Sequence, residues 1–132
     1  MSRRGPKGAG IYPVSPQGRI LLGKRSKYVN NPGRWDGWGG SRESGETYEQ
    51  CALREFFEET GYDGPMWLYL IDYPNRFIAA VPFEFTPRLN AETERAAWFE
   101  FNELWGLQPV NRGLARLLEN PHALNIILTL SR

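Results

Sequence analysis

The chain has 132 residues, a length typical of one domain, and 41% of them are hydrophobic, which indicates a globular rather than a disordered protein. Its net charge of +1 gives no reason to expect a general attraction to nucleic acid or to membranes. The single cysteine, Cys51, cannot form an intramolecular disulfide. No apolar run reaches the roughly 18 residues of a membrane span, and no signal-peptide pattern is present. We therefore expect a soluble, cytoplasmic protein.

The first eight residues are basic and rich in glycine, and they include Arg3, Arg4 and Lys7. This composition is typical of a frayed terminus, so we expect a flexible basic arm over residues 1–8 and one domain over residues 9–132. An arm that grasps phosphate is the alternative interpretation of the same charges.

Two apolar runs follow, at residues 9–14 and 19–23, and the turn-forming residues 15–18 separate them. This pattern predicts two adjacent strands or a hairpin. Lys24 and Arg25 come directly after the second run. Cations at the end of a strand can hold phosphates, and the alternative is a solvated surface.

Residues 28–36 predict a loop, and Trp35 and Trp38 bracket the short extended stretch after it. Tryptophans usually pack in a core, but one aromatic ring of this segment could instead stack on a nucleobase. Gly39 and Gly40 follow, and the lack of side chains lets the backbone approach a ligand closely.

A helix is predicted next because both of its ends are marked. Thr47 is suited to be the N-cap with Gln50 as its capping-box partner, and Gly61 is suited to end the helix in the left-handed conformation. One arc of this helix is expected to pack inward through Leu53, Phe56, Phe57 and Thr60.

Three carboxylates crowd the last turn of this helix: Glu55, Glu58 and Glu59. At spacings of three and four residues they project to one side and repel one another, and the helix dipole disfavours anions at this end. Such violations of local rules are expected at functional sites. Mg²⁺ or Mn²⁺, which take oxygen ligands, would relieve the repulsion. The alternative is a solvated acidic face.

The rest of the chain mixes strands and helices. Pro82 lies inside one predicted strand and indicates an edge position or a bulge, and the polar loop at residues 86–95 contains Glu92 and Glu94. The mixed order favours a single α/β domain, an α/β/α sandwich with a mixed β-sheet. We expect strands at residues 66–72, 77–85 and 96–101, a hairpin turn at 74–76, a helical turn at 102–104, and helices at 111–118 and from Pro121 onward.

The helix and the loop before it resemble the complete Nudix box of the Nudix hydrolase superfamily, which runs here from Gly40 to Tyr62. Each fixed position matches: Gly40, Glu46, Arg54, Glu55, Phe56, Glu58, Glu59, Gly61 and Tyr62. The resemblance implies the same α/β/α sandwich. One neighbouring position departs from the family pattern, because Trp38 stands where proline is usual, and this change is expected to alter the turn and the pocket wall.

The resemblance also implies roles for individual residues. Metal ligands would be Glu55, Glu58, Glu59 and the Gly39 carbonyl. Arg54 would orient Glu55 or Glu46, with Glu46 in a structural role. The general base would be Glu55 or Glu92, with Glu94 as the rival of Glu92. Substrate would contact Lys24, Arg25 and Trp38.

The implied activity is Mg²⁺- or Mn²⁺-dependent hydrolysis of a nucleoside diphosphate linked to another moiety. The small size resembles enzymes that act on (deoxy)nucleoside triphosphates. Nucleotide sugars, dinucleotides and capped RNA remain open as substrates. A module that senses a nucleotide without cleaving it and an isomerase of prenyl diphosphates are rival functions on the same fold. Formation of a homodimer also remains open.

Overall fold

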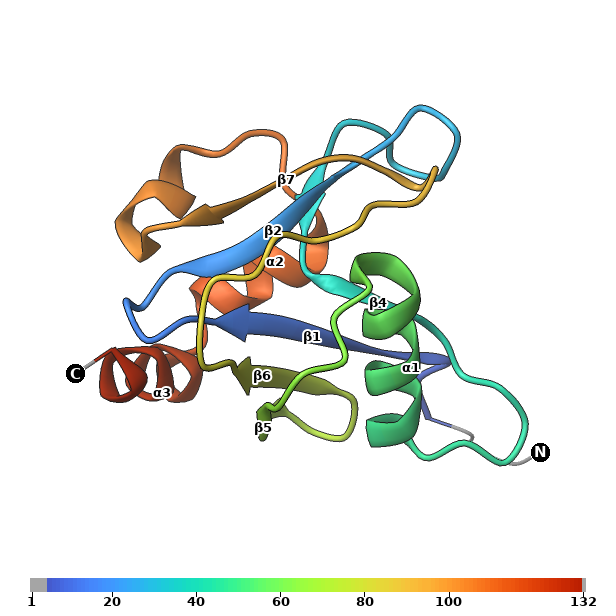
Figure 1. The fold of residues 1–132 in the computed structure, drawn as a ribbon, viewed down its shortest axis with the longest axis horizontal. Coiled ribbons are helices and arrows are strands. Elements are labelled where there is room, and N and C mark those ends of the chain that lie inside the picture. The colour runs from blue at the N-terminus through green and yellow to red at the C-terminus, as the bar shows by residue number, and fades with distance from the viewer. Residues whose placement is uncertain (1–4, 132) are drawn as a thin grey trace.

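The computed structural model describes residues 5–131 and contains one mixed sheet with helices on both faces (Figure 1). The strands are β1 (Gly8–Val14), β2 (Ile20–Arg25), β3 (Trp35–Asp36), β4 (Trp38–Ser41), β5 (Trp67–Asp72), β6 (Arg76–Ala80) and β7 (Thr93–Phe99). The α-helices are α1 (Tyr48–Thr60), α2 (Arg112–Leu118) and α3 (Pro121–Leu130), and a 3-10 helix, η1, spans Phe101–Gly106. The expected single α/β domain with a mixed sheet is confirmed.

The sheet opens into two halves, and one segment crosses between them. Its order is β3-β2-β1-β6-β5, while β4 pairs with β1 and β7 pairs with β2. Residues 35–41 therefore run beside β2 as β3 and then beside β1 as β4. At the crossing, a Cβ on Gly37 would lie 2.6 Å from the Tyr12 ring and 2.7 Å from the Ile11 carbonyl oxygen. Only glycine allows this close approach.

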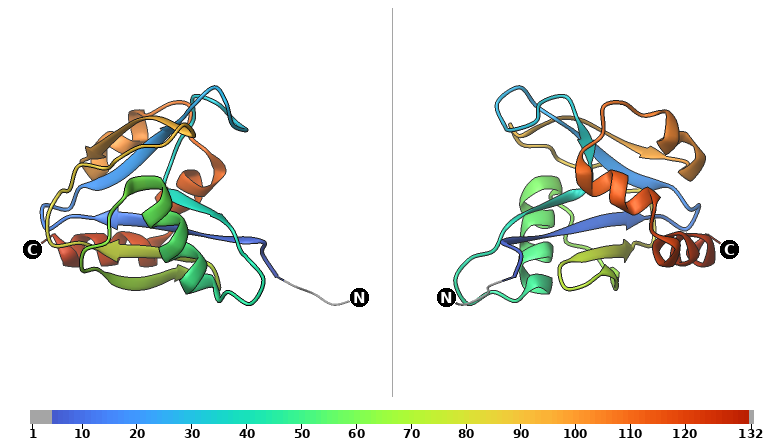
Figure 2. Two further views of the ribbon diagram at one scale, coloured as in Figure 1. Left: turned by 45° about the vertical axis from the view of Figure 1, so that its right-hand side comes forward. Right: turned by 180° about the vertical axis from the view of Figure 1, so that it is seen from behind.

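Alternation along the central strands divides the core into two clusters, one on each face of the sheet. On β1, Ile11 packs with the cluster under α1, whereas Tyr12 packs with the cluster under α2 and α3. Figure 2 shows α1 on one side of the sheet and α2 and α3 on the other. The observed layers are those of the predicted α/β/α sandwich.

Helix α1 has both predicted caps, but its buried face differs from the prediction. Thr47 and Gln50 form a capping box, and Gly61 has a φ of 75°. The expectation that Leu53 and Phe57 pack inward is wrong, since they are 37% and 50% exposed. The helix lies against β1 and β4, where glycines bring the backbone close, and it meets them through its small-residue side. Its buried residues are Cys51, Ala52, Phe56 and Thr60.

The strand predicted at residues 77–85 is shorter than expected. β6 ends at Ala80 and pairs with β1 on one side and β5 on the other, so it is neither an edge strand nor bulged at Pro82. Pro82 lies beyond the strand, where its missing N–H costs no ladder hydrogen bond. The other strand boundaries shift by one to three residues, and α2 and α3 lie where the sequence predicts them.

The basic N-terminal residues contact the box where the structure describes them. The Lys7 carbonyl accepts a 2.7 Å hydrogen bond from the Arg42 N–H, and the Pro6 carbonyl accepts one of 2.9 Å from the Tyr48 hydroxyl. Arg3 and Arg4 lie outside the described residues, and the flexible arm stays a prediction. None of the helices over residues 5–131 is long and apolar enough to cross a membrane.

Candidate active site

Arg54 of α1 binds the loop that precedes this helix. Its Nε and Nη2 donate to the two carboxylate oxygens of Glu46 at 2.5 and 3.0 Å, and Nη2 also donates to the Ser41 carbonyl at 2.9 Å. These charge-assisted bonds lower the pKa of Glu46 to about 2, with the hydrogen bond from Arg54 as the main cause. The expected structural pair of Glu46 and Arg54 is confirmed.

The same guanidinium reaches two of the crowded carboxylates. Arg54 Nη1 donates to Glu55 at 3.1 Å and to Glu58 at 3.2 Å. Burial raises the pKa of Glu55, the bonds from Arg54 oppose this, and the charges of Glu58 and Glu92 raise it further. A Cβ on Gly40 would lie only 2.4–2.6 Å from the Glu55 carboxyl group. Glycine at this position therefore makes room for the Glu55 carboxylate.

Glu59 is the most deeply placed of the three helix carboxylates. Its Oε1 accepts a 3.0 Å hydrogen bond from the Gly39 N–H on β4. Burial raises the pKa of Glu59 to about 8, the Gly39 bond opposes this, and the charges of Glu55 and Glu92 add to it. Arg25 lowers the same pKa. The structure thus brings Glu92 and Arg25 into the electrostatic neighbourhood of the helix carboxylates.

Glu92 and Glu94 lie close together in the sequence but have different contacts at the end of β2. Ser26, just after β2, donates its N–H to the Glu92 carbonyl at 2.9 Å and its hydroxyl to the Ala91 carbonyl at 2.6 Å. This anchor holds the Glu92 loop beside the site. Glu94 instead forms an ion pair of 3.6 Å with Lys24. Lys24 is thus paired with Glu94, whereas its neighbour Arg25 acts electrostatically on Glu59.

The carboxylates suit a hard divalent cation by chemistry, although their present contacts are with the protein. Among residues 5–131, no three acidic, histidine or cysteine side chains are grouped closely enough to hold one metal ion. Arg54 engages Glu55 and Glu58, and Glu59 turns toward Gly39. The side chain of Glu58 is 52% exposed. An all-oxygen donor set of this kind fits Mg²⁺ or Mn²⁺.

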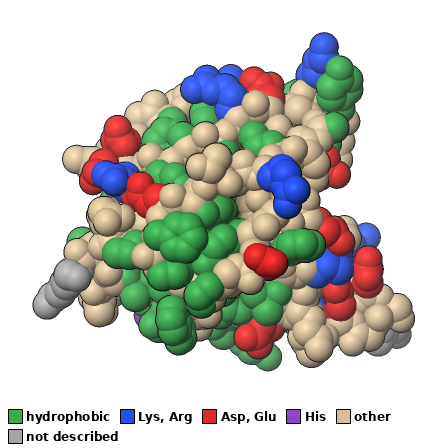
Figure 3. All heavy atoms as spheres, viewed as in Figure 1, with side chains coloured by type: hydrophobic (Ala, Val, Ile, Leu, Met, Phe, Trp, Pro, Cys, Tyr) green, Lys and Arg blue, Asp and Glu red, His purple; other side chains and the backbone are tan. Residues whose placement is uncertain are grey.

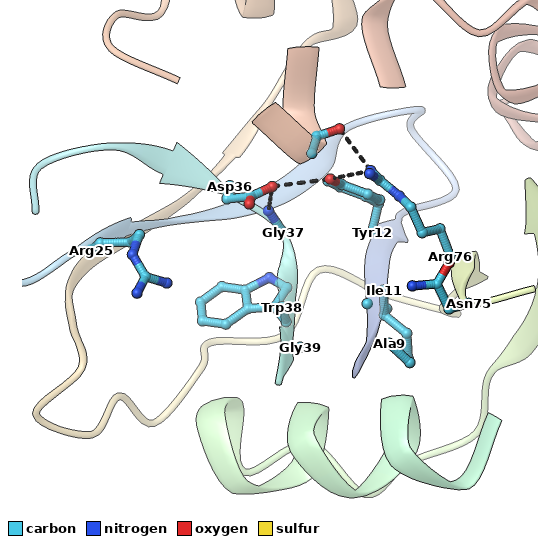
Figure 4. A pocket seen from close by; sticks show the side chains of 12 residues that line it. Ala9, Ile11, Tyr12, Arg25, Asp36, Gly37, Trp38, Gly39, Asn75 and Arg76 are labelled. Carbon is cyan, nitrogen blue, oxygen red and sulfur yellow. Dashed lines mark hydrogen bonds between the residues drawn. The ribbon is translucent and has the colours of Figure 1, made fainter. Parts of the chain in front are cut away.

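A polar pocket of about 240 Å³ lies between β1 and the segment of β3 and β4, and Figure 4 shows its lining residues. It is lined by Ala9, Gly10, Ile11, Tyr12, Arg25, Asp36, Gly37, Trp38, Gly39, Asn75, Arg76 and Gly113. Gly39 thus borders the pocket and also binds Glu59. Trp38 is buried, donates from Nε1 to the Leu21 carbonyl at 3.0 Å, and forms part of the wall.

Three polar side chains at the far end of the pocket form one network (Figure 4). The Tyr12 hydroxyl donates to Asp36 Oδ1 at 2.9 Å, and Arg76 Nη2 donates to the Tyr12 hydroxyl and to the Gly113 carbonyl, both at 2.6 Å. Burial raises the pKa of Tyr12 well above its ordinary value and keeps the hydroxyl protonated. Within the described chain, no hydrogen bond engages Asp36 Oδ2, which remains available as an acceptor.

Sequence reasoning missed this network. Asp36 carried a usable signal, because it is a charged residue in a short extended stretch between two tryptophans. Tyr12 and Arg76 carried none, since 64 residues separate them and the parallel pairing of β1 with β6 is what joins them.

Comparison with known proteins identifies the family. A family model described as NUDIX domain matches residues 5–120, which is most of the chain. Together with the sandwich fold and the carboxylate-bearing helix, this match shows that the chain belongs to the Nudix hydrolase family.

Individual relatives differ in what they act on. Over 51 residues the chain is 48% identical to an oxidized purine nucleoside triphosphate hydrolase of Danio rerio, covering 39% of this chain and 31% of that protein. Over 122 residues it is 30% identical to the NAD-capped RNA hydrolase NudC of Edwardsiella ictaluri, covering 86% and 47%. The chain thus spans less than half the length of each of these curated relatives. The fold matches the crystal structure of the Nudix hydrolase RenU from M. smegmatis with a TM-score of 0.74 at 21% identity, covering 93% of this chain and 86% of that one.

Proposed function

We propose that this chain hydrolyses a phosphoanhydride bond of a purine (deoxy)nucleoside triphosphate, with Mg²⁺ or Mn²⁺ as cofactor. One observation supports this most directly: Gly39 lines the polar pocket, and its N–H binds Glu59 of the carboxylate cluster. A nucleotide with its base in this pocket would have the carboxylates of α1 next to it, on the other side of Gly39. The name of the Danio rerio relative agrees with a purine nucleoside triphosphate as substrate.

The metal would be held by Glu55, Glu58 and Glu59, with the Gly39 carbonyl as a further ligand. When bound, Mg²⁺ or Mn²⁺ neutralises phosphate charge and lowers the pKa of a water. Arg25 lies within electrostatic reach of Glu59 and lines the pocket, so it supplies a cation for the phosphates. Arg54 acts on the other side, where it orients Glu55 and fixes Glu46.

A proton acceptor for the attacking water is available on two elements. Glu55 is half-buried, and its raised pKa favours proton uptake. Glu92 lies on the loop anchored by Ser26, and its charge acts on both Glu55 and Glu59. We assign the role of base to Glu55 first and to Glu92 second.

The pocket supplies contacts for a nucleobase. Asp36 Oδ2 can accept a hydrogen bond from an N–H group of a purine, since Oδ1 is already engaged by Tyr12 and Gly37. Trp38 provides part of the wall, and a ring of purine size is suited to a cavity of about 240 Å³.

Product analysis tests the proposal. The purified chain is incubated with GTP, dGTP, ATP and 8-oxo-dGTP in Mg²⁺ or Mn²⁺, and the expected products are a nucleoside monophosphate and pyrophosphate. The Glu58→Gln variant is expected to lose most of this activity while keeping its fold. Asp36→Ala is expected to raise KM about tenfold, which corresponds to the loss of one hydrogen bond of about 1.4 kcal/mol. Full turnover by Glu58→Gln, or no turnover of any triphosphate, would contradict the proposal.

A dinucleotide cap is the second candidate substrate. The match to the NAD-capped RNA hydrolase extends over 86% of this chain, further than the match to the triphosphate hydrolase. Adding NAD and NAD-capped RNA to the same panel decides between them by kcat/KM. A nucleotide sensor without turnover is less well supported, because all box carboxylates are present.

A further inference from the structure

We infer that a second cavity, beyond the C-terminal end of α1, binds a nucleoside monophosphate, with the base on Phe83 and the phosphate on Arg88. This cavity measures about 270 Å³ and shares no lining residue with the pocket at Gly39. Its lining residues come from two segments: Thr60, Gly61, Tyr62, Asp63 and Gly64 after α1, and Phe83, Phe85, Thr86 and Arg88 after β6. The inference does not depend on which substrate is hydrolysed.

The aromatic side of this cavity is rigidly supported. Tyr62 stacks on Phe85 with 4.2 Å between ring centroids, and its hydroxyl donates to the Pro65 carbonyl at 2.5 Å. Phe83 meets Tyr62 edge-on at 6.3 Å and remains 55% exposed. Figure 3 shows that hydrophobic side chains gather on this face, beside α1. An exposed ring on a fixed support is a stacking platform that accepts any nucleobase.

Arg88 provides the positive charge of the cavity. Its backbone N–H donates to the Thr60 carbonyl at 2.7 Å, which ties its segment to the end of α1. The guanidinium lies over Gly61, where an added Cβ would be 3.2 Å from Nη2. Within residues 5–131 no ion pair or side-chain hydrogen bond engages this guanidinium. A free guanidinium with five N–H donors is suited to bind phosphate oxygens in pairs.

Asp63 and Thr86 complete the polar rim and narrow the ligand class. Both side chains are exposed and line the same cavity. The Asp63 carboxylate can accept a hydrogen bond from an exocyclic amino group, whereas it repels a second phosphate. A ligand that satisfies the ring platform, the cation and the acceptor together is a nucleotide with one phosphate and an amino-bearing base. Neither a nucleoside nor inorganic phosphate uses all three contacts.

A binding experiment without metal tests this inference apart from catalysis. The ¹⁵N-labelled chain in EDTA is titrated with GMP, AMP, guanosine and inorganic phosphate, and amide shifts are followed by NMR. We expect GMP or AMP to shift the amides of Gly61, Tyr62 and Arg88, with an affinity at least tenfold above that of guanosine or phosphate. Shifts confined to the pocket amides, such as Gly37 and Gly39, or equal affinity for phosphate alone, would overturn the inference.

Matched variants separate binding from stability. Phe83→Ala and Arg88→Gln are expected to weaken GMP binding at least tenfold, with thermal midpoints close to that of the wild type because both side chains are exposed. Trp105→Ala and Arg112→Gln remove an equally exposed aromatic ring and an exposed cation elsewhere, and they are expected to leave binding unchanged. Unchanged GMP affinity in Arg88→Gln would contradict the site. If Arg88→Gln folds poorly, Arg88→Lys must retain weakened binding for the inference to stand.

Discussion

The surroundings of Glu59 disfavour the ionised form of its carboxyl group. It is largely removed from water, next to Glu55 and Glu92, and its pKa is raised to about 8. In the unfolded chain the same carboxyl ionises near 4.5. Between these two pH values the folded state holds a proton that the unfolded state has released. The stabilisation is therefore complete at low pH and is lost as the pH rises toward 8.

This linkage gives a prediction for the metal-free protein. Glu59→Gln keeps an oxygen acceptor for the Gly39 N–H and cannot ionise. The wild type should lose on the order of 2–3 kcal/mol of unfolding free energy relative to this variant between pH 6 and pH 9. Urea denaturation in EDTA at several pH values measures the difference. Parallel pH profiles of the two proteins would show that Glu59 is not buried as described.

Glu92 and Glu94 lie two residues apart in the sequence but interact with different charged groups. Glu92 acts on the carboxylates of α1, whereas Glu94 is paired with Lys24. Glu92→Gln is expected to reduce kcat about 10-fold or more, a modest effect for a group in general base catalysis. Glu94→Gln should change kcat less than twofold. Initial rates at saturating substrate provide the test, and equal losses in the two variants would remove the distinction.

Some residues of the candidate site could be predicted from the sequence, and others could not. The Nudix box places Glu55, Glu58 and Glu59 on one helix, as local geometry predicts, but among the described residues these side chains are not grouped closely enough to hold a metal ion. The separation of Lys24 from Arg25 was not predictable, because it depends on which face of β2 each residue occupies and on the register shift between them. Likewise, Tyr12, Asp36 and Arg76 meet only through sheet pairing of distant strands.

Helix α1 packs closely on β4 at two adjacent glycines, Gly39 and Gly40, and these two glycines have different neighbours. A Cβ on Gly40 would meet the end of the Glu55 side chain, which can move. A Cβ on Gly39 would lie 2.2 Å from the Ala9 carbonyl oxygen of β1, which cannot move without breaking the strand pairing. A substitution at Gly40 should therefore affect the position of Glu55, whereas a substitution at Gly39 should affect the pairing of β4 with β1.

Alanine at each glycine tests this difference. Gly40→Ala should lower the unfolding free energy by less than about 1 kcal/mol, as for a tolerated surface change, yet reduce kcat at least tenfold because the Glu55 carboxylate is displaced. Gly39→Ala should cost about 1–3 kcal/mol, the range for overpacking. Denaturation and rate measurements on both variants are needed. A strongly unfolded Gly40→Ala, or a Gly39→Ala as stable as the wild type, would contradict this fit.

Boundaries of elements were less predictable than their existence. The capping box and Gly61 fixed α1 because caps are local. Its buried face was misjudged, since hydrophobicity alone favoured Leu53 and Phe57, and the glycines of β4 instead bring Cys51 and Ala52 to the contact. β6 ended early for a similar reason: its two neighbours set its length, and the apolar residues after Ala80 turn toward the aromatic cluster around Phe85.

On the scale of the whole molecule, the candidate site spans the division of the sheet. Helix α1 packs on β1 and β4, whereas the Glu92 loop is fastened to the end of β2 through Ser26. The sequence indicated a mixed sheet but not this division, because Gly37, where the chain crosses between the halves, has no signature beyond being a glycine. A cation held by the carboxylates of α1 would lie near the charge of Glu92 and would relieve the repulsion among these glutamates.

Binding of a cation at these carboxylates predicts stabilisation of the folded protein by metal. At a Mn²⁺ or Mg²⁺ concentration ten times Kd, binding to the folded state adds about 1.4 kcal/mol. For a domain of this size that gain corresponds to a rise in thermal midpoint of about 4–6 °C. Differential scanning fluorimetry in EDTA and in millimolar metal measures it, with a non-hydrolysable triphosphate added in a parallel series. The double variant Glu58→Gln/Glu59→Gln should abolish this rise in thermal midpoint, because it keeps the fold but lacks two charged ligands. Equal midpoints of the wild type with and without metal, in the presence of the nucleotide as well, would show that the carboxylates of α1 do not hold a cation.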